Sequence, residues 1–160
     1  MPKSTVMTRP NDLYKVDFYA WTQQQAELLR EKRFDDLDLE NLIDEVASVG
    51  GSEKREVESR LEVLLAHLIK WRFQPGARSP SWRSTVGEQR QRISKILKSS
   101  PSLKSYPGGE LELAYLSGRL LAAKETGIDF SLFPETCPFT IEQVLDENFW
   151  PKEVGLYDQS

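Results

Sequence analysis

The amino-acid sequence predicts an all-α protein: an antiparallel helical bundle of about five main helices plus one or two short helices. Apolar residues recur at the three- and four-residue spacing of a helix over most of the chain. Capping residues and glycine stops mark the ends of these segments, and no alternating run of β-branched residues bounded by tight turns indicates a strand. The helices are therefore expected to bury their apolar stripes against one another.

Two helices are predicted before residue 51. Asp17 is expected to cap a helix that runs to about Lys32, in which Gln25 interrupts the apolar face. Asp38 is expected to cap the next helix, whose apolar residues keep helical spacing: Leu39, Leu42, Ile43, Val46 and Val49. Gly50 is expected to end that helix in a left-handed conformation, so that residues 50–52 form the turn of an antiparallel helical hairpin.

The remaining helices follow in the second part of the chain. A long helix is predicted over residues 53–73, and a segment with two prolines and a glycine separates it from a helix that begins near Trp82. A short helix is expected at Ser100-Pro101. Residues 110–126 have two apolar faces and are expected to form a central helix that ends at Gly127, and Thr140 with Gln143 predicts a capping box for a last short helix.

Length and composition fit one domain and favour a cytoplasmic protein. We expect a flexible segment over residues 1–13, a single helical domain over residues 14–151 and a tail over residues 152–160. No run of 18 apolar residues occurs, and the first residues lack the apolar region of a signal peptide, so we expect no membrane span and no export. Cys137 is the sole cysteine, which excludes an internal disulfide and a two-cysteine zinc site.

Charge is unevenly distributed along the chain. Residues 70–104 contain nine basic residues and one acidic residue, whereas residues 10–69 and 105–160 are both acidic. Such asymmetry indicates either an anion-binding face or an internal match between the basic and acidic segments.

One group of polar and aromatic residues joins the third predicted helix to the fourth: His67, Trp71, Gln74, Arg78, Trp82, Arg83, Gln89 and Arg90. Guanidinium groups over indole rings are the arrangement of sites that bind phosphates or carboxylates. The alternative is structural, with the arginines pairing with acids such as Glu40, Asp44 or Glu45. We prefer the structural interpretation, because polar clusters in small helical domains are more often architectural.

Catalytic and metal-binding motifs are not indicated. His67 is the sole histidine, and Cys137 lacks the helix N-terminus directly after it that would lower a thiol pKa, so the pair makes a poor base and nucleophile. No Glu-x-x-His motif or phosphate-binding loop is present. We therefore predict neither a metal nor a cofactor, and lean against enzymatic activity.

A family resemblance rests on residues that occur in one order along the chain. They include Asp17-Phe18-Tyr19-Ala20-Trp21, Asp38-Leu39-Glu40-Asn41-Leu42-Ile43-Asp44-Glu45, His67-Leu68-Ile69-Lys70-Trp71, Ser81-Trp82-Arg83, Cys137-Pro138-Phe139 and Phe149-Trp150-Pro151. With these, residues 14–151 resemble the bacterial proteins grouped as domain of unknown function 29, abundant in cyanobacteria. The resemblance implies an all-helical fold and no particular activity. Gly118 departs from the family's pattern and is expected to mark close helix packing.

Three functions remain open from the sequence. The preferred one is a non-enzymatic protein-interaction or regulatory module, whose partner docks on the acidic helices or on the basic fourth helix. The second is a small-anion-binding protein or enzyme that uses the His/Arg/Trp cluster. The third is nucleic-acid binding through the basic segment 70–104, where aromatic and basic residues are interleaved. No membrane partner is expected, and the oligomeric state is left open.

Overall fold

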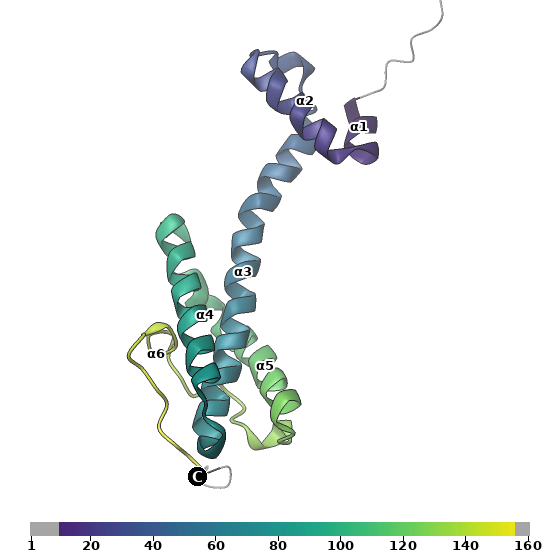
Figure 1. Ribbon diagram of the computed structural model, residues 1–160. Helices are drawn as coiled ribbons and strands as arrows, with labels where there is room; N and C mark the ends of the chain where they lie inside the picture. Colours follow the sequence, from purple (N-terminus) through teal and green to yellow (C-terminus); the bar gives the residue numbers. More distant parts are fainter. Residues whose placement is uncertain (1–9, 156–160) are drawn as a thin grey trace, which may run out of the picture. The chain divides into compact units, whose positions relative to one another are not determined.

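The computed structural model describes residues 10–155 and confirms the all-α fold. Within these residues the chain forms six α-helices and no strand (Figure 1). The helices are α1 (Pro10–Val16), α2 (Phe18–Arg30), α3 (Leu39–Phe73), α4 (Pro80–Ser99), α5 (Tyr106–Thr126) and α6 (Ile141–Leu145). Short 3-10 turns lie between several of these helices.

The chain divides into two compact units, Met1–Gly51 and Ser52–Ser160. The boundary falls inside α3, so each unit contains one part of that helix. This division does not test whether residues 14–151 fold as one domain, which stays a prediction. The predicted flexible segment and tail lie largely outside the described residues, although residues 10–13 belong to α1.

The predicted helix end at Gly50 is wrong. Residues 49–53 are helical within α3, and Gly127 is the sole glycine with a positive φ among the described residues. A glycine in a helix interior costs about 1 kcal/mol relative to alanine, which a long helix tolerates when no proline removes a backbone donor. The turn predicted at residues 50–52, and the helical hairpin it would have made, are therefore not formed at this position.

In the first unit, α2 and the start of α3 are joined by buried hydrogen bonds. The side chain of Asp17 caps α2 as predicted, accepting a bond from the backbone N–H of Ala20. The indole Nε1 of Trp21 donates to Asp38 Oδ2 at 2.9 Å, and the backbone N–H of Asp38 donates to Gln25 Oε1 at 2.8 Å. Gln25, which interrupts the apolar face of α2, is thus a buried partner of the residue before α3.

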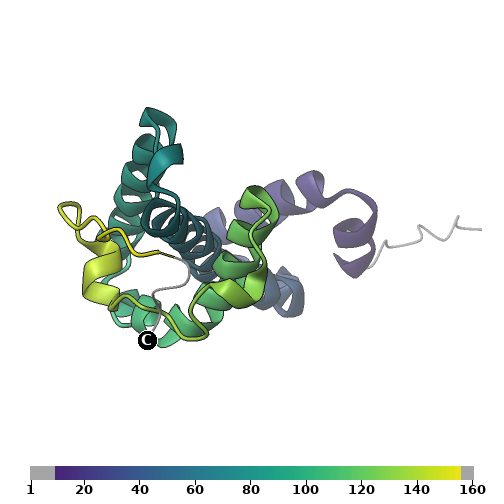
Figure 2. The same cartoon turned by 90° about the horizontal axis from the view of Figure 1, so that it is seen from below.

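In the second unit, residues 52–73 of α3 pack with α4 and α5 around an apolar core. Figures 1 and 2 show these three helices side by side, with α6 and the C-terminal segment near them. The core contains fully buried aliphatic residues of α3 and α4 together with aromatic residues of the loop before α6, among them Leu61, Leu64, Leu68, Ile93, Phe133 and Phe139. The short connection between α3 and α4 makes these two helices antiparallel.

Helix ends in this unit follow local sequence signals. The hydroxyl of Ser79 caps α4, with Pro80 in its first turn. Gly127 ends α5 in the left-handed conformation, with φ of 73°. Thr140 and Gln143 form both bonds of the predicted capping box at α6. The predictions at Gly127 and at Thr140 with Gln143 are confirmed, because each depends on residues within one helical turn, whereas the cap at Ser79 was not predicted.

Helix α5 buries one of its two apolar faces. Ala114, Gly118 and Ala122 are buried toward the bundle, whereas the second face remains exposed over residues 113–120. The expectation that this helix is central rested on two apolar faces, and only one of them is covered among the described residues. Small residues on the inner face bring α5 close to α3, which leaves the larger leucines on the opposite side.

Candidate functional site

The three arginines of the predicted cluster assemble around Trp71, and Trp150 joins them. The rings of Trp71 and Trp150 lie 4.4 Å apart at an interplanar angle of 43°. Arg78 lies over Trp71 at 4.8 Å, and Arg83 lies over both rings at 5.4 and 5.0 Å. Arg90 lies over Trp150 at 5.6 Å. Cation–π contacts therefore link three guanidinium groups through two indole rings.

Arg90 is a structural member of this cluster. Its side chain is 3% exposed, and it donates from Nε to the carbonyl of Val144 at 2.8 Å and from Nη2 to that of Phe149 at 2.9 Å. A longer bond of 3.4 Å reaches the carbonyl of Gln143. These acceptors lie at the end of α6 and in the chain after it, where the carbonyl of Gln143 also accepts from the backbone N–H of Asp146. Burial lowers the pKa of Arg90, with opposing contributions from Asp146 and Glu147.

The predicted acidic partners make other contacts. Glu45 accepts a hydrogen bond from the hydroxyl of Tyr14, which raises the pKa of that tyrosine, and Glu40 and Asp44 are exposed. Among the described residues, none of the ion pairs involves these acids or the three arginines of the cluster. Every residue has a backbone carbonyl, so the sequence does not indicate which carbonyls Arg90 binds. Acidic side chains were the partners that the sequence could suggest.

The remaining cluster residues lie around Lys70 and along α4. Lys70 is buried, pairs with Glu125 at 2.7 Å and lies over the Trp82 ring at 4.6 Å. Gln89 accepts a hydrogen bond from Arg60 at 3.1 Å. Gln74 ends α3, where its backbone N–H donates to the carbonyl of Lys70. Lys70, Trp82 and Gln89 thus connect α3 with α4 and α5, whereas the bond of Gln74 lies within the end of α3.

His67 is half-buried and held by its own helix. Its Nδ1 lies 2.8 Å from the carbonyl of Val63, so this nitrogen carries the proton. Burial lowers the pKa of His67, and Lys70 lowers it further, while the bond to Val63 and the charge of Glu125 act in the opposite direction. The neutral imidazole therefore keeps Nε2 as its acceptor.

Cys137 has the properties of a packed thiol. Burial raises its pKa to about 11, and its Sγ lies 3.4 Å from the carbonyl of Phe139. A thiol with this pKa is protonated near neutral pH and is a weak nucleophile. No group of three or more His, Cys, Asp or Glu within the described residues is arranged to hold a metal ion.

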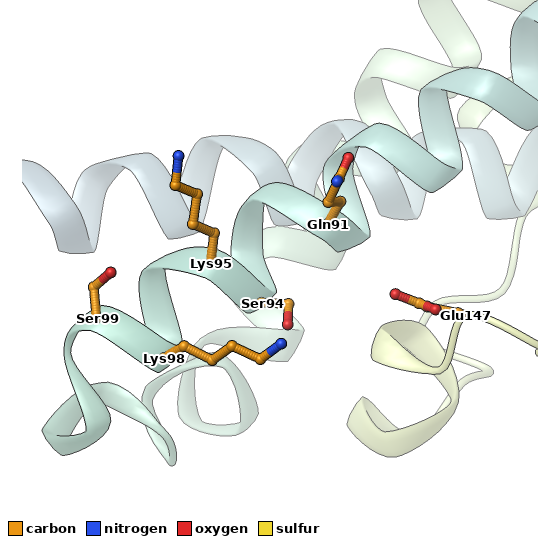
Figure 3. A pocket seen from close by; sticks show the side chains of 6 residues that line it. All are labelled: Gln91, Ser94, Lys95, Lys98, Ser99 and Glu147. Carbon is orange, nitrogen blue, oxygen red and sulfur yellow. The ribbon is translucent and has the colours of Figure 1, made fainter.

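The outer face of α4 carries an open polar hollow of about 490 Å³. Its lining residues are Gln91, Ser94, Lys95, Lys98, Ser99 and Glu147. Figure 3 shows Lys98 and Glu147 extending toward one another from opposite sides, whereas Gln91 and Lys95 point away from them. No aromatic residue lines the hollow, so it lacks the apolar walls of a small-molecule site.

The basic segment 70–104 does not present the aromatic platform of a nucleic-acid site. Trp71 and Phe73 are buried, and Trp82 is half-buried beneath Lys70. Stacking on single-stranded bases requires exposed rings beside cations. This arrangement gives no support to base stacking, and Lys95 and Lys98 of α4 are exposed.

A stripe of exposed aliphatic residues runs along the first turns of α3. Leu39, Ile43, Val46 and Val49 are 61%, 59%, 70% and 72% exposed. Sequence reasoning identified this helical stripe but took it for a core face. We call these four residues the α3 stripe.

Trp150 is the cluster residue that sequence reasoning did not include. It follows the last helix, in a segment without helical periodicity, and its partner Trp71 is far away in the sequence. The composition of this segment could have indicated its contact with the cluster. Two aromatic residues and a proline occur together at positions 149–151, whereas a solvated tail would be polar.

The described part of the chain contains no helix both long and apolar enough to cross a membrane. Comparison with curated proteins found no match, and comparison with solved structures found none either. The family described as Domain of unknown function DUF29 matches residues 13–150. This match includes the cluster, the α3 stripe and the helices that carry them, and it confirms the resemblance seen in the sequence. The chain therefore belongs to the DUF29 family.

Proposed function

We propose that the protein is a non-enzymatic interaction module that binds a basic amphipathic helix of a partner protein through the α3 stripe. The single observation that carries this proposal is the exposure of four large aliphatic side chains on one helix. Leu39, Ile43 and Val46 follow one another at spacings of four and three residues, so they lie on the same face. A contiguous exposed apolar face of this kind is typical of protein interaction sites.

The acidic residues beside the α3 stripe favour a partner with basic residues. Residues 34–51 contain six acidic residues and no lysine or arginine. Glu40 and Asp44 are exposed on the same helix as the α3 stripe. A helix with leucines on one face and lysines or arginines at its edges would cover the stripe and neutralise these acids.

A second copy of this chain fits the same surface poorly. Two α3 stripes facing each other would bring the acids of one copy near those of the other, with no basic residue between 34 and 51 to compensate. Like charges across an interface disfavour association. A heterologous basic partner is therefore the better match.

The absence of enzymatic activity is the second part of the proposal. It is supported by the protonated Cys137 thiol, the neutral half-buried His67 and the structural bonds of Arg90. A cytoplasmic location is also proposed, on the basis of composition and the single cysteine.

Binding can be tested with a designed helical peptide that has leucines on one face and lysines elsewhere. Fluorescence anisotropy of this peptide with the full chain should give a dissociation constant that rises with salt. The double substitution Ile43→Ser and Val46→Ser should weaken binding at least about tenfold, because it removes two apolar contacts of about 1 kcal/mol or more each.

The matched control is the pair Leu113→Ser and Leu116→Ser, which removes two exposed aliphatic side chains from α5. This control should leave binding within about twofold. Equal losses for both pairs, or equal binding of a peptide with glutamates in place of lysines, would contradict the proposal. In cells, a photocrosslinker at Val46 should capture a partner that one at Ser48 does not.

A further inference from the structure

A second site, apart from the α3 stripe, lies where the end of α3 meets the C-terminal segment. A pocket of about 410 Å³ opens there, within the size range of small-molecule sites. Its lining comes from α3, the loop before α6, α6 itself and the chain after it: Arg72, Pro138, Phe139, Gln143, Asn148, Phe149, Trp150, Pro151, Lys152 and Val154. The C-terminal segment is fixed here by a bond from the N–H of Val154 to the carbonyl of Arg72.

Arg72 gives the pocket a cation without a counter-ion. Its guanidinium forms no ion pair with a carboxylate of the described residues, and its Nε is buried without a hydrogen-bond partner. It is held between the rings of Phe73 and Phe139, at 5.6 and 5.8 Å from their centres. Removing a guanidinium from water in this way is costly unless an anion compensates it.

Three other arginines near the C-terminal segment each have at least one carbonyl acceptor. Arg90 donates to three carbonyls, Arg78 donates from Nε to the carbonyl of Trp71, and Arg119 donates to that of Phe133. One nitrogen of Arg78 and one of Arg119 are also buried without a partner, but Arg72 combines such a nitrogen with a place in the lining of a pocket and with two aromatic rings. An incoming anion would pair with the charge of this guanidinium.

Aromatic rings form the wall of the pocket. Phe139 and Phe149 meet edge to face at 5.9 Å, and Trp150 is held in place by Trp71. A ring that enters the pocket can therefore contact preformed aromatic faces. Flat apolar surfaces of this kind favour an aromatic ligand over a hydrated inorganic anion, because apolar rings cannot replace the water that such an anion would lose.

The lining carries positive charge at two places and no carboxylate. Arg72 lies at the end of α3, and Lys152 is exposed on the C-terminal segment. Gln143 and Asn148 add amide groups that can donate hydrogen bonds. A planar guanidinium matches the two oxygens of a carboxylate, and a nearby lysine adds attraction without fixing geometry.

We propose that this pocket binds a small aromatic molecule that carries a carboxylate, with the ring against Phe139, Phe149 and Trp150 and the carboxylate toward Arg72. The site differs from the predicted one at His67, Arg78, Arg83 and Arg90, although Trp150 belongs to both. It goes beyond the proposed interaction surface and uses none of its residues.

The test is calorimetric titration of the full chain with four probes. These are 2-naphthoate, the neutral 2-naphthylmethanol, acetate and 2-naphthyl phosphate. Naphthoate should bind at least tenfold more tightly than naphthylmethanol and acetate, because it alone combines the ring with the carboxylate. Equal binding of naphthoate and naphthylmethanol would overturn the proposal, and tighter binding of the phosphate would overturn the assignment of a carboxylate.

Variants then locate the site. Arg72→Gln should weaken naphthoate binding at least tenfold and leave naphthylmethanol unchanged, and Lys152→Gln should weaken naphthoate severalfold. The control Arg92→Gln removes an exposed arginine of α4 and should change neither.

If Arg72→Gln does not fold, the naphthoate affinity of Lys152→Glu tests the proposal instead, because Lys152 is exposed and its replacement leaves the core intact. Unchanged naphthoate affinity in a folded Arg72→Gln chain, or in Lys152→Glu, would overturn the proposal.

Discussion

Gly118 of α5 lies directly against the backbone of Glu62 in α3. A Cβ atom at position 118 would be 2.9 Å from the carbonyl oxygen of Glu62, and 3.1 Å from both the backbone nitrogen of Ala66 and the Cβ of Leu65. Because these neighbours are backbone atoms or the first atom of a side chain, they cannot move aside without shifting α3. The two helices therefore approach this closely only with glycine at this position.

The substitution Gly118→Ala should consequently destabilise the protein, although alanine is the better helix former. Overpacking costs about 1–3 kcal/mol, which exceeds the gain of about 1 kcal/mol in helix propensity. The matched control is Gly87→Ala in α4, where nothing lies within 4 Å of the new Cβ. Urea unfolding should show a loss for the first variant and a gain of about 0.5–1 kcal/mol for the second. A gain at both positions would contradict the close packing.

Arg90→Met should destabilise the second unit by about 2–4 kcal/mol, since it leaves the buried carbonyl of Val144 and the part-buried carbonyl of Phe149 without this donor. Its three acceptors all lie between Gln143 and Phe149, so hydrogen exchange should become faster in α6 and the chain after it. The comparison variant is Arg92→Met, whose ion pair with Glu88 is exposed and 3.8 Å long. That change should stay within about 0.5 kcal/mol. Similar effects of both variants would argue against the structural role of Arg90.

The sequence predicted those features of the fold that depend on neighbouring residues. The caps at Asp17 and Thr140 and the end of α5 at Gly127 are each satisfied within one turn of helix. Gly118 could be interpreted as a packing position because glycine is unfavourable in a helix unless space demands it. In each of these cases the residue type and its neighbours in the sequence favour one local structure.

Features that depend on distant residues could not be predicted in the same way. Gly50 is compatible with both a helix stop and a helix interior, and local sequence does not distinguish them. Trp150 belongs to the cluster through its contact with Trp71, and Arg90 binds carbonyls that any residue type would provide. The exposure of the α3 stripe was also unpredictable, because a helical stripe has the same spacing in a core and at an interface.

The continuity of α3 predicts that Gly50→Ala stabilises its helix. A Cβ at this position meets nothing within 4 Å, and the backbone has no positive φ that would strain alanine. We expect a gain of about 0.5–1 kcal/mol and slower hydrogen exchange across residues 48–54. Faster exchange there would instead indicate a left-handed turn, in which alanine is strained.

The Cys137 thiol should react slowly while the protein is folded. With its pKa raised to about 11 by burial, the thiolate fraction at pH 8 is far below that of an ordinary cysteine with a pKa near 8.5. We expect the rate with a disulfide reagent to be at least about a hundredfold lower in the native protein than in urea. Because Cys137 is the sole cysteine, the reaction can be followed without interference. Equal rates in the two states would show that the thiol is neither buried nor perturbed.

The stability of the protein should fall as the pH drops below about 6.5, and His67 should account for this fall. Burial lowers the pKa of His67 in the folded state, and Lys70 adds to the effect. The unfolded chain therefore takes up a proton near pH 6.5 while the folded chain resists it, so the contribution is present above that pH and declines between it and the lower folded value. Since His67 is the sole histidine, this window contains no other imidazole.

His67→Gln is the informative variant, because a glutamine amide can still donate to the carbonyl of Val63 but does not titrate. Urea unfolding at pH 7.5 and 5.5 should show a loss of stability for the original chain and a clearly smaller loss for the variant. Carboxylates that titrate at lower pH contribute equally to both chains and cancel in the comparison. The same loss in both would place the pH dependence elsewhere, and a gain at pH 5.5 would mean that folding favours the charged imidazole.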